Sequence, residues 1–217
     1  MSARENILAR IRAAQGKPPV ADAAEQQVVR AHLDARALSP RPRTAGDPPA
    51  EFRARALALA STLTEVANLG DVPRAVSEYL QGSALPVAAV CWPEFAALDW
   101  RAAGLQVESR AARDADLLGI TGAFCAIAET GTLMLVTGPD TPASTSLLPE
   151  THIALVRAER IVPHMEEAWR LLRGERADWP RAVNFVSGPS RTADIEQTVT
   201  LGAHGPYRVH IIVIAGG

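Results

Sequence analysis

From Leu117 to the end of the chain, short apolar runs alternate with helical segments, and this alternation limits the possible folds more than any other feature. Each apolar run has the length of a strand, and several are continuous, as expected for strands buried on both faces. The runs span residues 123–129, 132–137, 151–157, 182–188 and 207–214. Helical patterns fall at 163–175 and 191–199. We therefore predict an α/β fold whose mostly parallel sheet carries helices on both faces.

The first half of the chain is organised differently. Ser2 and Glu5 form a capping-box pattern at the start of an amphipathic N-terminal helix. Six of the sixteen prolines fall within 16–50, around one possible helix at 21–38. We therefore predict an N-terminal helix and proline-rich arm over 1–50 and an α/β domain over 51–217. The early part of that domain should hold helices at 50–64 and 72–81 and strands at 86–92 and 105–109.

The composition excludes several classes of function. The chain has 217 residues and a formal net charge of −2, which argues against a general nucleic-acid binder. Its two cysteines, Cys91 and Cys125, cannot supply the four ligands of a zinc or iron–sulfur site, and we expect them to be buried thiols. No apolar run approaches the roughly 18 residues of a membrane span, and the N-terminus carries no secretory pattern. We expect a cytoplasmic protein.

The first segment that could carry chemistry is AIAETGTLML at 126–135. A strand runs into Glu129, turns through Thr130 and Gly131, and leaves as a second strand beginning at Thr132. A carboxylate beside a glycine at such a corner is well placed to meet a ligand, and exposed N–H groups in the turn can hold an anion. The alternative is a hairpin with a polar corner and no ligand.

A second candidate is the segment NFVSGPSRTADIEQ at 184–197. A strand ends near Val186, and we expect a loop to lead into a helix beginning near Arg191 or Thr192. The free N–H groups of that helix, with the nearby hydroxyls and guanidinium, would suit a phosphate or carboxylate. The ligand-binding candidates are Ser187, Gly188, Pro189, Ser190, Arg191, Thr192, Asp194 and Glu196. The alternative is an ordinary capped loop in which Asp194 and Glu196 favour the first helical turn.

The third candidate is the segment LGAHGPYRVH at 201–210. His204 lies between Gly202 and Gly205, just before the last strand, where a histidine could bind a ligand or transfer a proton. It could equally be hydrogen-bonded to a neighbouring loop. The histidines have no metal-ligand spacing, so we predict no metal site.

Three segments together resemble one family. They read AETGT at 128–132, SLLPETHIALVRAERIVPHM at 146–165, and NFVSGPSRTADIEQTVTLGAHGP at 184–206. In this order and at these spacings they are similar to the LUD-domain family, in its lactate utilization protein C (LutC/YkgG) branch. The resemblance covers about residues 115–214 and extends to the first half of the chain only in general plan.

The resemblance implies a NagB/RpiA/CoA-transferase-like α/β fold and a role in oxidising L-lactate to pyruvate. It also implies iron–sulfur partner proteins, the A and B components, while this chain has no cofactor and would be the non-redox member. It would bind a small carboxylate or the partner subunits. The motif positions that carry over are Glu129 to Thr132, Ser187 to Arg191 with Asp194 and Glu196, and Gly202, His204 and Gly205.

Two other functions stay open at this point. Related folds use a glutamate in a similar turn as an acyl nucleophile, so the chain could be a stand-alone CoA-transferase-like or sugar-phosphate-isomerase-like enzyme with Glu129 as nucleophile or base. It could also be a ligand-sensing or scaffolding protein whose site is vestigial.

Overall fold

The computed structural model describes residues 2–38, 40–43, 46–192 and 200–216. The chain divides into two compact units, Met1–Arg41 and Pro42–Gly217. Within the described residues, no helix is both long enough and apolar enough to cross a membrane.

The smaller unit holds two helices, α1 (Ala3–Ala14) and α2 (Ala23–Ala35). The predicted capping box is confirmed, because the Ser2 hydroxyl accepts from Glu5 N–H and the Glu5 carboxylate accepts from Ser2 N–H. The two helices are linked through Glu25, which pairs with Arg12 at 2.6 Å and with Lys17 at 2.7 Å. These two hydrogen-bonded cations lower the pKa of Glu25 to about 2.

The larger unit is built on a six-stranded sheet in which every neighbouring pair of strands is parallel. The strand order is β1-β12-β7-β4-β2-β3. The strands are β1 (Thr62–Val66), β2 (Ala88–Cys91), β3 (Gln106–Ser109), β4 (Leu118–Gly122), β7 (Thr151–Arg157) and β12 (Arg208–Ile214). The central strands β4, β7 and β12 are buried almost throughout, which explains the long apolar stretches of β7 and β12. The predicted α/β class is confirmed.

The structure adds a second, four-stranded sheet to this plan, with the order β8-β5-β6-β9. Its strands are β5 (Cys125–Ile127), β6 (Thr132–Val136), β8 (Ile161–Val162) and β9 (Val183–Val186). β5 pairs parallel to β8 and antiparallel to β6, and β6 pairs antiparallel to β9. The predicted corner at Thr130 and Gly131 is therefore a β5–β6 hairpin.

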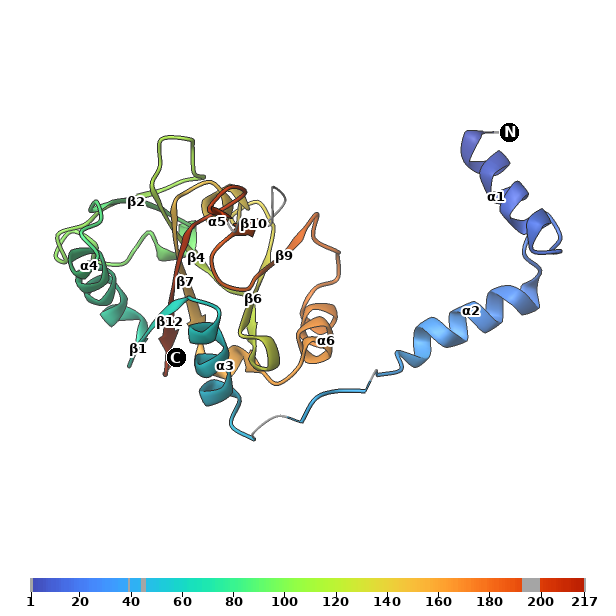
Figure 1. Ribbon diagram of the computed structural model, residues 1–217, viewed down its shortest axis with the longest axis horizontal. Coiled ribbons are helices and arrows are strands. Elements are labelled where there is room, and N and C mark those ends of the chain that lie inside the picture. Colours follow the sequence, from blue (N-terminus) through green and yellow to red (C-terminus); the bar gives the residue numbers. More distant parts are fainter. Residues whose placement is uncertain (1, 39, 44–45, 193–199, 217) are drawn as a thin grey trace. The chain divides into compact units, whose positions relative to one another are not determined.

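Helices complete the layers, as Figure 1 shows. The longer ones in this unit are α3 (Pro48–Ala58), α4 (Val72–Gly82) and α6 (Met165–Glu175), and α5 (Ser144–Leu147) is a single turn. α4 covers one face of the six-stranded sheet, the four-stranded sheet covers the other, and α6 lies on the far side of the four-stranded sheet.

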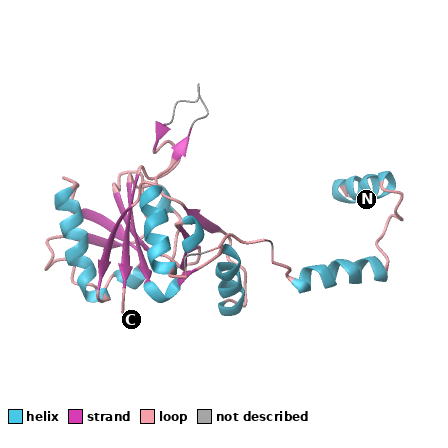
Figure 2. Cartoon of the chain, turned by 60° about the horizontal axis from the view of Figure 1, so that its bottom comes forward, coloured by secondary structure: helices cyan, strands magenta, loops and turns pink. Residues whose placement is uncertain are grey.

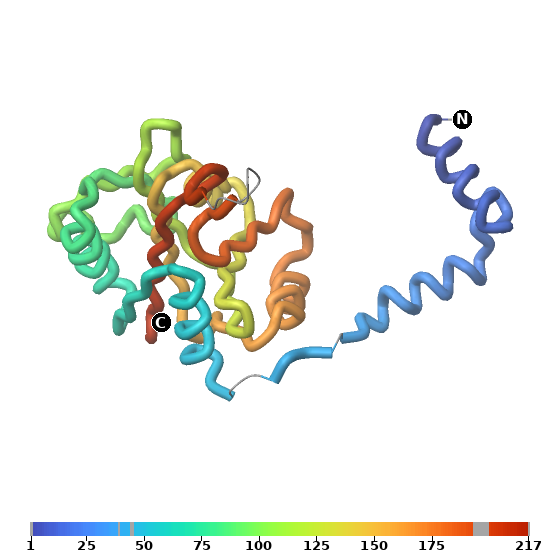
Figure 3. Tube along the Cα trace, in the orientation of Figure 1, coloured from blue at the N-terminus to red at the C-terminus, as the bar shows by residue number. Residues whose placement is uncertain are grey.

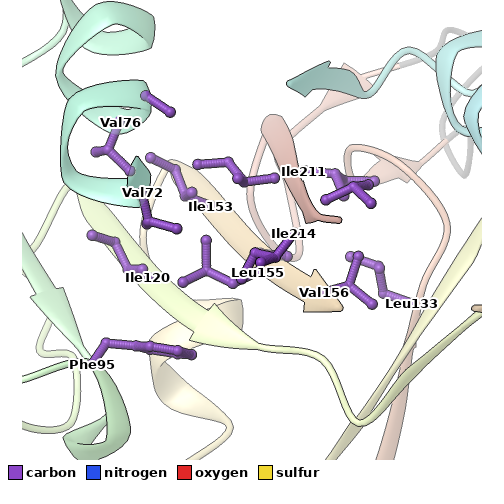
Figure 4. Packing of buried hydrophobic residues seen from close by; sticks show 14 of the residues in the cluster. Val72, Val76, Phe95, Ile120, Leu133, Ile153, Leu155, Val156, Ile211 and Ile214 are labelled. Atoms are coloured by element: carbon purple, nitrogen blue, oxygen red, sulfur yellow. The ribbon is translucent and has the colours of Figure 1, made fainter. Parts of the chain in front are cut away.

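Side chains of the four-stranded sheet alternate between two hydrophobic cores. Leu133 and Leu135 join the main core with the large sheet, while Met134 and Val136 pack with Leu172 of α6. The main core also holds the buried side of α4. Figure 4 shows Val72 and Val76 on one side of the large sheet and Leu133 on the other. Because both faces of β6 are buried, its sequence is as continuously apolar as that of a central parallel strand.

Two sequence predictions are wrong in detail. The helix expected over 50–64 ends at Ala58, and residues 62–66 instead form β1, which pairs with β12. Ala60 adopts a left-handed conformation with φ 65°, which ends the helical geometry before the strand begins.

The helix expected over 191–199 does not begin where predicted. Arg191 and Thr192 form β10, which pairs antiparallel with β11 (Thr200–Leu201). The neighbouring backbone is paired as well, because Ser190 N–H donates to Pro206 and Gly202 N–H donates to Ser190. This pairing satisfies backbone groups that a helix start would leave free. Residues 193–199, including Asp194 and Glu196, lie outside the described residues.

Candidate functional site

The turn that carries Glu129 is a single 3-10 turn, Ala128–Thr130, closed by Gly131 in the left-handed region at φ 63°. Helix α3 packs directly on this turn, and Figure 3 shows the two segments side by side. A Cβ atom at Gly131 would lie 2.6 Å from the backbone nitrogen of Ala56, so this approach requires glycine. The glycine of the motif thus fixes the turn against α3, while the Thr130 side chain stays exposed.

The Glu129 carboxylate lies at the N-terminus of α6. Its Oε1 accepts a hydrogen bond from Met165 N–H at 2.9 Å, and its Oε2 lies 2.8 Å from His164 Nδ1. The backbone is held too, because Glu129 N–H donates to the Pro163 carbonyl. Both side chains of the Glu129–His164 pair are only 12% exposed. A carboxylate is favoured at this end of a helix by the free N–H groups and the helix dipole.

The contact assigns distinct roles to the two His164 nitrogens. A carboxylate only accepts hydrogen bonds, so Nδ1 carries a proton toward Glu129. In the neutral ring, Nε2 is then the basic nitrogen. A glutamate that orients a histidine in this way is a common arrangement for proton transfer. Glu129 is predicted from the sequence as a site residue, whereas His164 is not.

Replacing Glu129 with alanine is expected to lower the free energy of unfolding by about 1–3 kcal/mol, because Met165 N–H and His164 Nδ1 lose their acceptor. Glu129→Gln keeps an acceptor oxygen and should lose less. Chemical denaturation of the three proteins measures this order. Equal stability of Glu129→Ala and the wild type would contradict the geometry.

The loop after β9 is joined to the Glu129 turn through hydroxyl groups. Thr132 Oγ1 and Ser187 Oγ lie 2.6 Å apart, and Thr132 Oγ1 also donates weakly to the Thr130 carbonyl at 3.4 Å. The next residue, Gly188, has φ 79°, and a Cβ atom there would lie 2.3 Å from the Leu59 carbonyl oxygen. The loop therefore rests on the end of α3, as the Glu129 turn does.

The 187–192 loop also contacts the glycine-rich segment before β12. Ser190 N–H donates to the Pro206 carbonyl at 2.8 Å, and a Cβ at Gly205 would lie 3.5 Å from Ser190 Cβ. Gly202, at φ 77°, closes the turn against Tyr207. Tyr207 N–H in turn donates to Glu150, the residue before β7.

These two loops therefore lie at the amino ends of β7 and β12. Figure 2 shows the β10–β11 hairpin at the end of the larger unit opposite to the C-terminus. Ligands of open α/β sheets bind outside the carboxyl ends of the strands, so a ligand-binding loop would be expected there. The 187–192 segment does follow the carboxyl end of β9, but β9 belongs to the four-stranded sheet. In the large sheet, the segment therefore lies at the amino ends of the strands.

The other candidate residues predicted from the sequence differ in their burial and in their contacts. Pro189 is buried, and Arg191 is exposed but donates through Nη2 to the Leu59 carbonyl at 3.0 Å. Thr192 is half-buried in β10. His204 is exposed in the loop before Pro206. The structure thus brings together Thr132, the 187–192 loop and the glycine-rich segment. The histidine that contacts Glu129 is His164 and not the predicted His204.

Among the residues that the structure describes, no three histidine, cysteine or acidic side chains gather where they could hold a metal ion. Cys91 and Cys125 are free and fully buried, as predicted. Desolvation raises the pKa of Cys91 to about 11 and is the main cause that raises the pKa of Cys125 to about 12.

The parallel sheet and the four-stranded sheet define an α/β protein. Its candidate site consists of the Glu129–His164 pair and the two joined loops. The family model of the LUD domain matches residues 84–214, a stretch that contains every candidate site residue. This chain belongs to the LUD-domain family.

Curated relatives agree with this membership. The lactate utilization protein C of Bacillus licheniformis is 38% identical over 119 residues, which are 54% of this chain and 49% of the relative. That of Bacillus subtilis is 39% identical over 101 residues, 45% of this chain and 42% of the relative. An uncharacterized protein of Neisseria meningitidis is 40% identical over 99 residues, 44% of this chain and 41% of the relative. The matches thus span about half the length of these curated relatives.

A solved structure supports the fold. A DUF162 family protein from Deinococcus radiodurans superposes with a TM-score of 0.57 and 23% identity, covering 80% of this chain and 99% of that one.

Proposed function

We propose that this chain is a component of a system that oxidises L-lactate to pyruvate and that it performs no redox chemistry itself. The observation that carries the proposal is the similarity to proteins named lactate utilization protein C, at 38–43% identity. Because the matches cover about half of this chain and half of each relative, the proposal is made for the LUD domain.

The state of the two cysteines supports the non-redox part of the proposal. Both thiols are buried in separate cores, Cys91 with the large sheet and Cys125 with α6. Their raised pKa values keep them as neutral thiols, whereas a metal cluster binds thiolates. Electron transfer would then fall to iron–sulfur partner proteins, the A and B components of the system.

The joined loops support a role in binding a small carboxylate or a partner surface. The exposed guanidinium of Arg191 donates only through Nη2 to the Leu59 carbonyl, and its other N–H groups could pair with a carboxylate, while the contact between the Thr132 and Ser187 hydroxyls holds the loop to the Glu129 turn. Gly131 and Gly188 hold this set against α3. In this proposal the Glu129–His164 pair supplies a basic nitrogen beside the same turn.

The contacts of Glu129 favour a positioning role over the alternative role of acyl nucleophile. Each of its oxygens already accepts a hydrogen bond, one from the α6 backbone and one from His164. An attacking carboxylate would have to give up one of these contacts.

The proposal is tested by purifying the tagged full chain from cells grown on L-lactate. We expect cysteine-rich, iron-containing proteins to co-purify, identified by mass spectrometry and metal analysis. An unrelated tagged protein is the control. Recovery of this chain alone would contradict the proposed membership of a complex.

A further inference from the structure

A cavity of about 520 Å³ lies at the carboxyl ends of the strands of the large sheet, whereas the motif loops lie at the amino ends. Trp92 follows β2, and Gly122, Arg157 and Ile214 are the last residues of β4, β7 and β12; all four line the cavity. In open α/β sheets, ligands bind outside the carboxyl ends of the strands. The loops that carry the sequence motifs lie at the amino ends of the strands, so this cavity is separate from the site described above.

The size and the lining of the cavity are typical of a site for an organic ligand. Its volume lies within the range of small-molecule pockets, and most of its lining is apolar or aromatic. The apolar lining includes Leu69, Trp92, Phe95, Phe124, Val136 and Leu155. The indole N–H of Trp92 is already satisfied by the Pro142 carbonyl at 3.2 Å, so Trp92 presents an apolar surface. A ligand with an apolar body would cover these apolar side chains.

Three arginines give the cavity its positive charge. Arg160 is neutralised by Glu175, with contacts of 2.5 and 2.9 Å, and its Nε donates to the Phe124 carbonyl. Arg157 and Arg176 are exposed, and their side chains make no hydrogen bond or ion pair within the described part of the chain. These two guanidinium groups are therefore available to an anion.

One carboxylate faces the arginines. Glu94 lies on the turn after β2 and is exposed, and its Oε1 lies 2.6 Å from the position that a Cβ atom at Gly122 would take. Desolvation raises the pKa of Glu94, and the charge of Arg157 partly offsets the rise. Glu94 thus lies next to the end of β4, within the electrostatic reach of Arg157.

With Glu175 bound to Arg160, the cavity holds two available cations and one carboxylate. This balance suits a single negative charge, because a dianionic phosphate would add repulsion from Glu94. We propose that the cavity binds a monoanionic carboxylic acid with an apolar body larger than that of lactate. Arg157 and Arg176 would hold its carboxylate, and Glu94 would accept a hydrogen bond from a neighbouring hydroxyl. The inference goes beyond the proposed function and does not depend on it.

The test uses 3-phenyllactate as the probe, with L-lactate and phenyl phosphate for comparison, titrated calorimetrically into the full chain. The aromatic ring adds apolar area that lactate lacks, so 3-phenyllactate should bind at least about tenfold more tightly. Arg157→Ala and Arg176→Ala should each weaken its binding by about 10–100-fold, the loss expected for a charge-assisted hydrogen bond. Arg181→Ala, an exposed arginine outside the cavity, is the matched control and should change nothing.

Tighter binding of 3-phenyllactate, weakened in either cavity variant and unchanged in Arg181→Ala, supports the inference. Three results would overturn it: no binding of 3-phenyllactate at millimolar concentration, equal or tighter binding of lactate or phenyl phosphate that the cavity variants weaken, or wild-type affinity in both cavity variants. Because the side chains of Arg157 and Arg176 are exposed and form no hydrogen bond or ion pair with a described residue, both variants should fold, which thermal unfolding checks. These outcomes are independent of whether iron–sulfur proteins co-purify with the chain.

Discussion

Lowering the pH from about 7.5 to about 5 is expected to remove about 4 kcal/mol from the free energy of unfolding, because two histidines are buried in the neutral state. His152 is fully buried on β7 and His210 is 2% exposed on β12. Desolvation lowers the pKa of each from 6.5 to about 4. The unfolded chain binds these protons near pH 6.5 and the folded chain does not, so stability is present above pH 6.5 and falls as the pH drops toward 4. Each histidine contributes about 2 kcal/mol of the loss at pH 5.

The surroundings of both rings explain why protonation is costly. Each ring makes one hydrogen bond to a threonine, His152 with Thr121 and His210 with Thr62, both at 2.8 Å. The second nitrogen of each ring is buried with no partner among the described residues. His210 also stacks on Tyr79 of α4, at 3.9 Å between ring centroids. A charged imidazolium would carry an unsatisfied N–H inside the core.

Denaturant titrations across this pH range measure the effect. The double variant His152→Asn, His210→Asn should be less stable at neutral pH but should lose much less on acidification. His204→Asn, at an exposed position, should keep the wild-type pH dependence. A wild-type stability that stays constant from pH 7.5 to 5 would show that these histidines are not held neutral.

Gly188→Ala is expected to lower the free energy of unfolding by about 2–5 kcal/mol, for two additive reasons. The position has φ 79°, where an alanine is strained by about 1–2 kcal/mol. The new methyl would also lie 2.3 Å from the Leu59 carbonyl oxygen, so the loop or the end of α3 must move. The same carbonyl accepts from Arg191, so that contact is expected to weaken as well.

Gly174→Ala is the matched control. This glycine lies within α6, has no atom within 4 Å of a new Cβ, and does not have a positive φ. Alanine there should leave stability unchanged or raise it by up to about 1 kcal/mol through helix propensity. Equal thermal and denaturant stability of Gly188→Ala and the wild type would refute the described packing of the loop on α3.

The class of fold could be predicted from the sequence because burial on both faces leaves a direct signal. The runs that became β7 and β12 are largely apolar, and their spacing with helical segments indicates a parallel sheet, whereas β4 was not predicted. The four-stranded sheet could not be separated from it, because β5 and β6 are also buried on both faces and look the same locally. β1 was missed since its strand form depends on pairing with β12, far away in sequence.

The site could be predicted in part. The Glu129 turn and the glycines at 131 and 188 follow from local chemistry, since each stands where a turn needs it. The partner of Glu129 could not be found in this way, because His164 lies 35 residues further along the chain. A weak signal existed, since His164 directly precedes an amphipathic helix, where a carboxylate is favoured. The strand at Arg191 and Thr192 was missed because its partner, Thr200–Leu201, carries no strand pattern of its own.

Growth of a strain lacking the gene tests the proposal that this chain serves lactate oxidation. We expect the deletion strain to fail on L-lactate as sole carbon source, to grow normally on pyruvate, and to regain growth on lactate when the wild-type chain is supplied. Growth of the deletion strain on L-lactate at the wild-type rate would contradict the account.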